Sequence, residues 1–194
     1  MRVVVAITGR AGSGKTTLAN KLVDRLAGFS LWSFATKLKA EVAGVLGISL
    51  LELAETKGSP ATRRLLQALG AARRAQDGLY FIRPVLAAIT SSPSERHVID
   101  DVRFPNELAA LRTLGHLITV RTVLLGAPVN LAGDDESETA LDYHPVTLRL
   151  EAFLGDWEKF DATVQKILDM LNTAPVASNP VKGGFDETPT SSPR

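Results

Sequence analysis

The sequence contains no cysteine, and only three of its 194 residues are histidine. Without cysteine the chain has no disulfides and no thiolate metal sites. The histidines, His97, His116 and His144, show no metal-ligand spacing, so we interpret them as ordinary surface or strand-end residues. No apolar run approaches the roughly 20 residues that a membrane-spanning helix needs. These absences argue against a disulfide-stabilised protein, a zinc-finger protein and an integral membrane protein.

The charge balance is also close to neutral. The 22 Lys and Arg residues against 21 Asp and Glu residues leave a formal charge of +1, which gives no general attraction to nucleic acid or to an anionic membrane. The first apolar run begins at residue 3, which leaves no room for a signal peptide. We therefore expect a cytoplasmic protein whose partner is a small-molecule substrate rather than nucleic acid or a membrane. The oligomeric state stays open, a homodimer included.

The composition divides the chain into one domain and a tail. With 45% hydrophobic residues, the chain can bury a good core in a single domain. Residues 173–194 are instead rich in Pro, Ser, Thr and Gly and have no apolar period. Such a composition cannot bury enough surface to offset its ordering entropy. We predict a domain over residues 1–172 and a flexible C-terminal tail over residues 173–194, with a docking segment as the alternative for the tail.

The most informative motif is G-R-A-G-S-G-K-T at residues 9–16, which completes the pattern G-x-x-x-x-G-K-[ST]. The apolar run Val3–Ile7 before it is typical of a buried parallel strand. After it, Leu18, Leu22 and Leu26 recur at helical spacing. A strand, a glycine-rich loop and a helix in this order form the context that makes the motif a P-loop. The alternative is a glycine-rich turn that binds nothing.

In a P-loop, glycines allow successive backbone N–H groups to point into one concavity, and the helix N-terminus adds positive partial charge. Lys15 can reach the outer phosphates of a nucleoside triphosphate, and the hydroxyl of Thr16 can bind Mg²⁺. The motif therefore predicts ATP and Mg²⁺ as the bound groups. The residues expected to cradle the phosphates are Gly9, Arg10, Ala11, Gly12, Ser13, Gly14, Lys15, Thr16 and Thr17.

A helix predicted from about residue 61 to 76 carries a polar face. At 100° per residue, Arg63, Gln67 and Arg74 fall within about 40° of one another. Such a stripe is most often simply solvated. Two arginines beside a glutamine would also suit a nucleoside monophosphate, with guanidinium groups on the phosphate and the amide on a base edge. Both interpretations stay open from the residues alone.

The segment around residues 98–107 is the second motif. Val98 and Ile99 can end a core strand and bring Asp100 and Asp101 to the carboxyl edge of the sheet, where open α/β sheets bind ligands. A carboxylate there can hold the hydration shell of Mg²⁺, and Arg103 lies close enough to meet a phosphate. The alternative is that the aspartates and Arg103 pair with one another or cap the helix that starts at Pro105.

The remaining periodicities complete an α/β pattern. Short apolar stretches predict strands at residues 31–34 and 118–125, and helical spacing predicts helices after residue 36 and from about residue 156. A Gly- and acid-rich loop covers residues 133–138. Alternating strands and helices predict an α/β fold with a mostly parallel central sheet flanked by helices.

Taken together, these motifs resemble the phage deoxynucleoside monophosphate kinases, a branch of the P-loop nucleotide kinases. The resemblance covers most of residues 1–171. It rests on the P-loop, on F-A-T-K-L-K at 34–39, on R-R-L-L-Q-A-L-G at 63–70 and above all on D-V-R-F-P-N-E at 101–107; Ser137-Glu138 resembles a Ser-Glu pair in the lid of the family.

The resemblance implies transfer of the terminal phosphate of ATP to a deoxynucleoside monophosphate, in the host cell cytoplasm if the gene is phage-encoded. It implies acceptor-binding helices at about residues 33–90 and a lid at about residues 122–145. Lys15, Arg63, Asp101 and Arg103 would be catalytic, with Thr16 and Asp101 toward the metal. The substrate residues would be Arg63, Gln67, Arg74, Asp101, Arg103, Arg121 and Glu138.

The sequence also departs from the family pattern. Asp135 and Glu136 stand where a histidine often precedes the Ser-Glu pair, Gly70-Ala71 replaces Gly-Thr, and Tyr80-Phe81 replaces an aromatic pair that usually contains Trp. A P-loop kinase of another small metabolite is the nearest alternative function. A P-loop ATPase is a further alternative, although the chain lacks a guanine-specificity N-K-x-D string and an apolar strand that ends in Asp-Glu.

Overall fold

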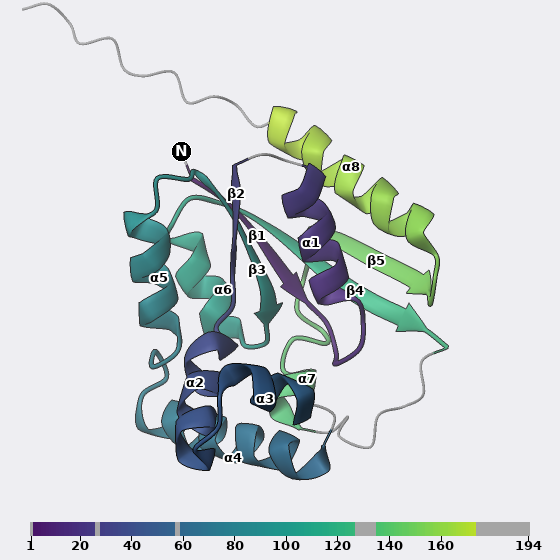
Figure 1. The fold of residues 1–194 in the computed structure, drawn as a ribbon. Coiled ribbons are helices and arrows are strands. Elements are labelled where there is room, and N and C mark those ends of the chain that lie inside the picture. Colours follow the sequence, from purple (N-terminus) through teal and green to yellow (C-terminus); the bar gives the residue numbers. More distant parts are fainter. Residues whose placement is uncertain (1, 26–27, 57–58, 127–134, 174–194) are drawn as a thin grey trace, which may run out of the picture.

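The centre of the protein is a five-stranded parallel sheet. In the computed structural model, which describes residues 2–25, 28–56, 59–126 and 135–173, the strands have the order β2-β3-β1-β4-β5 and every neighbouring pair is parallel (Figure 1). The strands are β1 (Val3–Thr8), β2 (Phe29–Trp32), β3 (Arg96–Val102), β4 (His116–Leu125) and β5 (Leu148–Phe153).

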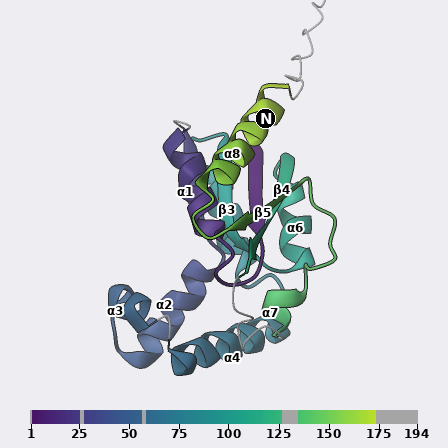
Figure 2. The ribbon, with the colours of Figure 1, turned by 90° about the vertical axis from the view of Figure 1, so that its right-hand side faces the viewer.

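Two helices cover one face of this sheet. Helix α1 (Lys15–Arg25) follows the P-loop, and α8 (Trp157–Thr173) ends the described chain; Figure 2 shows both on the same side. Successive strand residues point to opposite faces, so every second residue of β1 faces these helices. Their shared core contains Val5, Ile7, Leu18, Leu22, Phe160, Val164 and Ile167.

Helices α5 (Ile82–Ser91) and α6 (Pro105–Arg112) cover the other face. The alternate residues of β1, Val4 and Ala6, face this layer. Together with Ile89, Leu108 and Leu111 they form a second buried cluster. Both faces of the sheet are therefore covered, which explains why β1 is apolar at every position from Val3 to Ile7.

Three helices form a separate unit beyond the carboxyl edge of the sheet: α2 (Ala35–Leu46), α3 (Leu50–Glu55) and α4 (Pro60–Gln76), beside the short α7 (Glu136–Thr139) (Figure 1). Gly47 ends α2 in the left-handed region at φ 66°, and Ser49 and Glu52 form a capping box at the start of α3. This unit has its own small core of Val42, Ala43 and Leu53, packed against Leu38, Leu65, Leu66 and Leu69.

The predicted fold class, an α/β fold with a parallel sheet flanked by helices, is confirmed. Strand β2 begins two residues earlier than the sequence predicts, and β5, α3 and α5 are elements that the sequence analysis did not identify. Their stretches are short or mix polar and apolar residues, so tertiary contacts decide their structure. No helix in the described ranges is long and apolar enough to span a membrane.

His97 is not a surface residue: it is fully buried near the start of β3, where its Nδ1 accepts a hydrogen bond from Trp32 Nε1 at 3.0 Å. The range 122–145 predicted as a lid begins inside β4 and includes α7. Residues 127–134 of that range, and residues 174–194 of the predicted tail, lie outside the described residues.

Candidate active site

A cavity of about 530 Å³ opens at the carboxyl edge of the sheet, at the ends of β1 and β3. These strands are neighbours, with Thr8 opposite Val102, and the helices that follow them, α1 and α6, lie on opposite faces of the sheet. This reversal leaves a crevice between the two strand ends, the usual ligand position in open α/β sheets. The cavity is lined by residues 11–17 of the P-loop region together with residues of α2, α4, the end of β3 and α7.

The P-loop depends on glycine at its two ends. Gly9 has φ 140°, and a Cβ there would lie 2.4 Å from the carbonyl oxygen of Thr122 on β4. Gly14 has φ 88°, and a Cβ there would lie 2.7 Å from the ring of Phe160 on α8. A side chain at either position would be strained and would clash, so the loop packs this closely only with glycine.

Lys15 is folded back on its own loop. Its Nζ donates to the carbonyl oxygens of Gly9 and Arg10, both at 2.8 Å. Burial, with a smaller contribution from the charge of Arg103, lowers the pKa of Lys15 to about 8, although Glu138, Asp101 and Asp100 oppose the shift. The ammonium group therefore lies in a cavity where a negative charge would be favourable.

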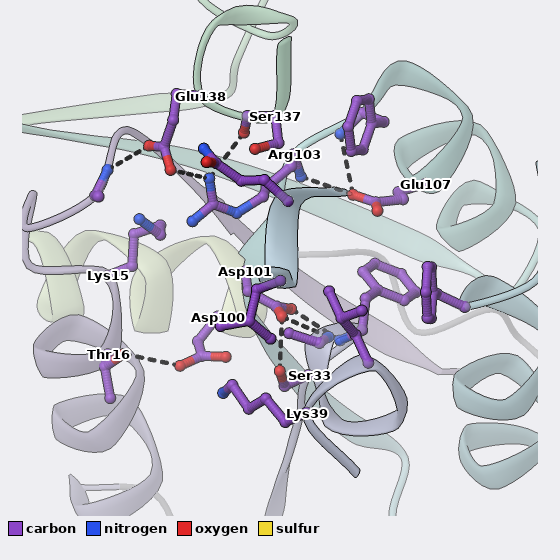
Figure 3. A pocket seen from close by; sticks show the side chains of 18 of the residues that line it. Lys15, Thr16, Ser33, Lys39, Asp100, Asp101, Arg103, Glu107, Ser137 and Glu138 are labelled. Carbon is purple, nitrogen blue, oxygen red and sulfur yellow. Dashed lines mark hydrogen bonds and ion pairs between the residues drawn. The ribbon is translucent and has the colours of Figure 1, made fainter. Parts of the chain in front are cut away.

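The two aspartates at the end of β3 have different partners, as Figure 3 shows. Asp100 Oδ2 accepts a hydrogen bond from Thr16 Oγ1 at 2.9 Å. Asp101 instead accepts from Ser33 Oγ at 2.6 Å and from the backbone N–H groups of Phe34 and Ala35 at 2.9 and 2.8 Å. The structure thus places Asp100, and not the predicted Asp101, beside Thr16.

Asp100 and Asp101 have different partners because side chains alternate between the two faces of a strand. Neighbouring residues point to opposite sides, so only one of two adjacent aspartates can face the P-loop. Asp101 fixes the start of α2, where it satisfies backbone N–H groups that have no partner inside the helix. Burial raises the pKa of Asp100, and the neighbouring charge of Asp101 raises it further.

Glu138 on α7 joins three parts of the site. One carboxylate oxygen accepts from the backbone N–H of Ala11 at 2.6 Å. The other contacts Arg103 at 2.6 Å (Figure 3) and Arg63 at 3.4 Å. The Glu138 side chain is only 5% exposed. Arg103 also donates to the carbonyl oxygen of Ser137 at 2.8 Å. A P-loop N–H group and two guanidinium groups therefore converge on one anionic group.

The polar face of α4 reaches the same cavity. Arg63, Gln67 and Arg74 all line it, as their shared helix face predicts. The guanidinium carbon of Arg74 lies 4.4 Å from the ring centroid of Phe104, and burial lowers the pKa of Arg74. Apolar side chains complete this part of the lining: Phe34, Leu38, Leu66, Phe81 and Phe104. The sequence analysis did not identify this apolar wall, which is assembled from four separate segments.

Three predicted residues lie outside the cavity lining. Gly9 shapes the loop through its backbone. Arg10 forms an ion pair with Asp142 at 2.6 Å and is half exposed. The Arg121 side chain donates to the carbonyl oxygens of Asp142 and His144, the latter at 3.1 Å. Arg121 therefore anchors the segment after α7, and its contact with a phosphate stays a prediction.

The sequence analysis did not identify the buried carboxylate of Glu107 as part of the site. Glu107 lies in the first turn of α6, lines the cavity and is 6% exposed. Its Oε2 accepts from the backbone N–H groups of Arg103 and Phe104 at 2.6 and 3.0 Å. The signal was present as Pro105 at the start of the helix followed by Glu107 two residues later, a pattern typical of a helix N-terminus.

No protein-family model and no curated protein matches the sequence. Among solved structures, a candidate kinase from Chloroflexus aurantiacus matches with a TM-score of 0.50 and 18% identity over 90% of this chain and 98% of the other. This likeness shows a shared fold, an α/β fold with a parallel sheet flanked by helices.

Two named enzymes match less closely. Shikimate kinase from Bacteroides thetaiotaomicron has a TM-score of 0.44 and 16% identity, over 88% of this chain and 98% of that one. APS kinase from Mycobacterium tuberculosis has a TM-score of 0.43 and 17% identity, over 89% and 98%. The finer resemblance to phage deoxynucleoside monophosphate kinases is not confirmed by these comparisons and stays a prediction.

Proposed function

We propose that this chain is a kinase that transfers the terminal phosphate of ATP to a deoxynucleoside monophosphate, giving the diphosphate. The observation that carries the proposal is a single cavity in which Lys15 and Thr16 of the P-loop lie together with Arg63, Gln67 and Arg103. The first two residues suit a triphosphate donor. The other three supply cations and an amide, which suit an acceptor that has both a phosphate and a base.

On the donor side, the loop from Gly12 to Thr17 and the start of α1 would hold the phosphates of ATP. Lys15 would leave the carbonyl oxygens of its own loop and contact the transferred phosphate. A bound triphosphate favours the charged ammonium, so it would raise the pKa of Lys15 above about 8.

The donor set beside Thr16 fits a magnesium ion. A threonine hydroxyl and the Asp100 carboxylate lie 2.9 Å apart, both are oxygen ligands, and Mg²⁺ usually fills its other positions with waters and phosphate oxygens. Thr16 and Asp100 would hold the ion, with Asp100 replacing Asp101 as the candidate carboxylate. When bound, the ion would neutralise charge on the donor phosphates.

On the acceptor side, Arg63 and Arg103 would hold the acceptor phosphate in line with the donor. These guanidinium groups converge on the Glu138 carboxylate, and this supports a role in binding an anionic group. An incoming phosphate would take over these donors, and Glu138 would move with α7. The apolar wall gives a flat base a surface on which to pack, and Gln67 can both donate to and accept from a base edge.

Little covalent chemistry is required of the protein. The acceptor phosphate is already anionic at neutral pH, so no general base is needed. Positioning of the two phosphates and stabilisation of the charge between them dominate phosphoryl transfer. In such enzymes one arginine that stabilises the transition state contributes on the order of a thousandfold or more to kcat.

The test is an assay of ADP formation with ATP, Mg²⁺ and each deoxynucleoside monophosphate in turn, with the diphosphates identified by chromatography. We expect stoichiometric diphosphate from at least one acceptor. Arg103→Ala should impair acceptor use far more than ATP binding, and a loss of ATP affinity alone would contradict the acceptor role. ATP consumption without diphosphate would point to a hydrolase or to a kinase of another metabolite.

A further inference from the structure

The turn between β3 and α6 carries two features of the acceptor half of the cavity. The Arg103 side chain reaches Glu138 at 2.6 Å. The Phe104 ring packs under the guanidinium group of Arg74, with 4.4 Å between the guanidinium carbon and the ring centroid. The position of this two-residue turn therefore sets where two cavity arginines lie.

One buried oxygen holds this turn. Glu107 Oε2 accepts from the N–H of Arg103 at 2.6 Å and from the N–H of Phe104 at 3.0 Å. These groups precede or begin α6, where N–H groups have no partner within the helix. Phe104, the residue before the helix, has no side-chain acceptor with which to cap it. Without Glu107, these two N–H donors would lose their partner, which is unfavourable unless the turn moves.

We propose that Glu107 is a positioning residue, which fixes Arg103 directly through its backbone and Arg74 indirectly through the Phe104 ring. The inference rests on the proposed function, because the ligand whose binding it tunes is the acceptor. The contact needs an oxygen that accepts two hydrogen bonds and does not need a negative charge. A glutamine at this position keeps such an oxygen, whereas an alanine removes it.

A second glutamate provides a matched control. Glu52 occupies the equivalent place in the first turn of α3, where Oε2 accepts from the Ser49 N–H at 2.7 Å. Glu52 is not among the residues that line the cavity. Glu52→Ala therefore removes the same kind of helix contact without touching the turn that carries Arg103.

The kinetic experiment compares wild type, Glu107→Ala, Glu107→Gln and Glu52→Ala, each checked for folding by thermal unfolding. Misplacing a substrate-positioning group by about 1 Å can cost on the order of a hundredfold, so we expect kcat/KM for the acceptor to fall by about 10- to 100-fold in Glu107→Ala. The KM for ATP should stay within about twofold. Glu107→Gln and Glu52→Ala should both remain close to wild type. Unchanged acceptor kinetics in Glu107→Ala, or equal losses for ATP and acceptor, would overturn the proposal.

If Glu107→Ala does not fold, Glu107→Asp replaces it. Aspartate keeps the charge but is one methylene shorter, so it should impair acceptor use while Glu107→Gln does not. The reverse order would overturn the proposal by showing that charge, and not the position of the oxygen, matters.

Hydrogen exchange of the Arg103 and Phe104 amides tests the same contact without any substrate. We expect faster exchange in the alanine variant (or the aspartate variant in its place) and wild-type exchange in Glu107→Gln; unchanged exchange would overturn the proposal. A wild-type protein that makes no diphosphate would refute the proposed function, and the exchange measurement would still decide whether Glu107 holds the turn.

Discussion

Ionisation of Glu107 should make the stability of the fold depend on pH in a defined direction. Burial and, to a lesser extent, the charge of Asp101 raise the pKa of this carboxyl group from 4.5 to about 7, although two N–H donors and Arg74 oppose the rise. The folded state thus binds the proton more tightly than the unfolded state. The stabilisation by the proton is complete below the unfolded pKa and is lost as the pH rises through about 7.

The size of the effect follows from the two pKa values. A shift of one unit corresponds to about 1.36 kcal/mol, and the linkage relation for 4.5 and about 7 gives a loss of about 2.5 kcal/mol in unfolding free energy between pH 5 and pH 8. Other groups titrate as well, so the quantity of interest is the difference between wild type and Glu107→Gln. Both proteins carry those other groups, and the variant keeps an oxygen acceptor for the two N–H donors.

The assay is urea unfolding of both proteins from pH 5 to pH 8, followed by tryptophan fluorescence. The unfolding free energy of wild type minus that of Glu107→Gln should fall by about 2.5 kcal/mol over this range. A difference that stays flat would show that Glu107 titrates at its ordinary pKa. A difference that rises with pH would show that the N–H donors outweigh burial, and either result would refute the reasoning.

Three further predictions test the proposed roles of residues in the cavity. Lys15→Ala should lower the rate of diphosphate formation by at least about a thousandfold without unfolding the protein, because the transferred phosphate loses its cation; normal turnover would exclude the P-loop role. Arg63→Ala should raise the KM for the acceptor at least about tenfold, whereas Arg64→Ala, on the exposed side of the same helix, should change it less than twofold; equal effects of the two would contradict the assignment. Asp100→Asn should raise the Mg²⁺ concentration needed for half-maximal rate. Asp101→Asn should mainly lower the melting temperature, because it weakens the contacts at the start of α2. A magnesium titration and a melting curve of each variant would show whether the roles are reversed.

The local parts of the site were accessible from the sequence because each depends on short spacing. The P-loop needs its glycines and Lys15 within eight residues, and a shared helix face places Arg63, Gln67 and Arg74 together. In the structure, P-loop residues 11–17 and these three residues of α4 line the same cavity. The choice between Asp100 and Asp101 was not accessible in this way. It depends on which face of β3 meets the P-loop, and the packing of α1 and α2 around the strand sets that.

The sequence by itself determined the α/β class, the glycine-rich loop between β1 and α1 and the polar face of α4, because hydrophobic period and glycine placement act over a few residues. Tertiary structure alone decided how Glu138 bridges the P-loop, Arg63 and Arg103, since these residues lie up to 127 positions apart in the chain. It also decided that Arg121 binds the chain itself, that His97 is buried, and that Glu107 holds the turn beneath Arg103. These outcomes depend on which residues, distant in the sequence, become buried against one another. Only the tertiary structure determines that packing.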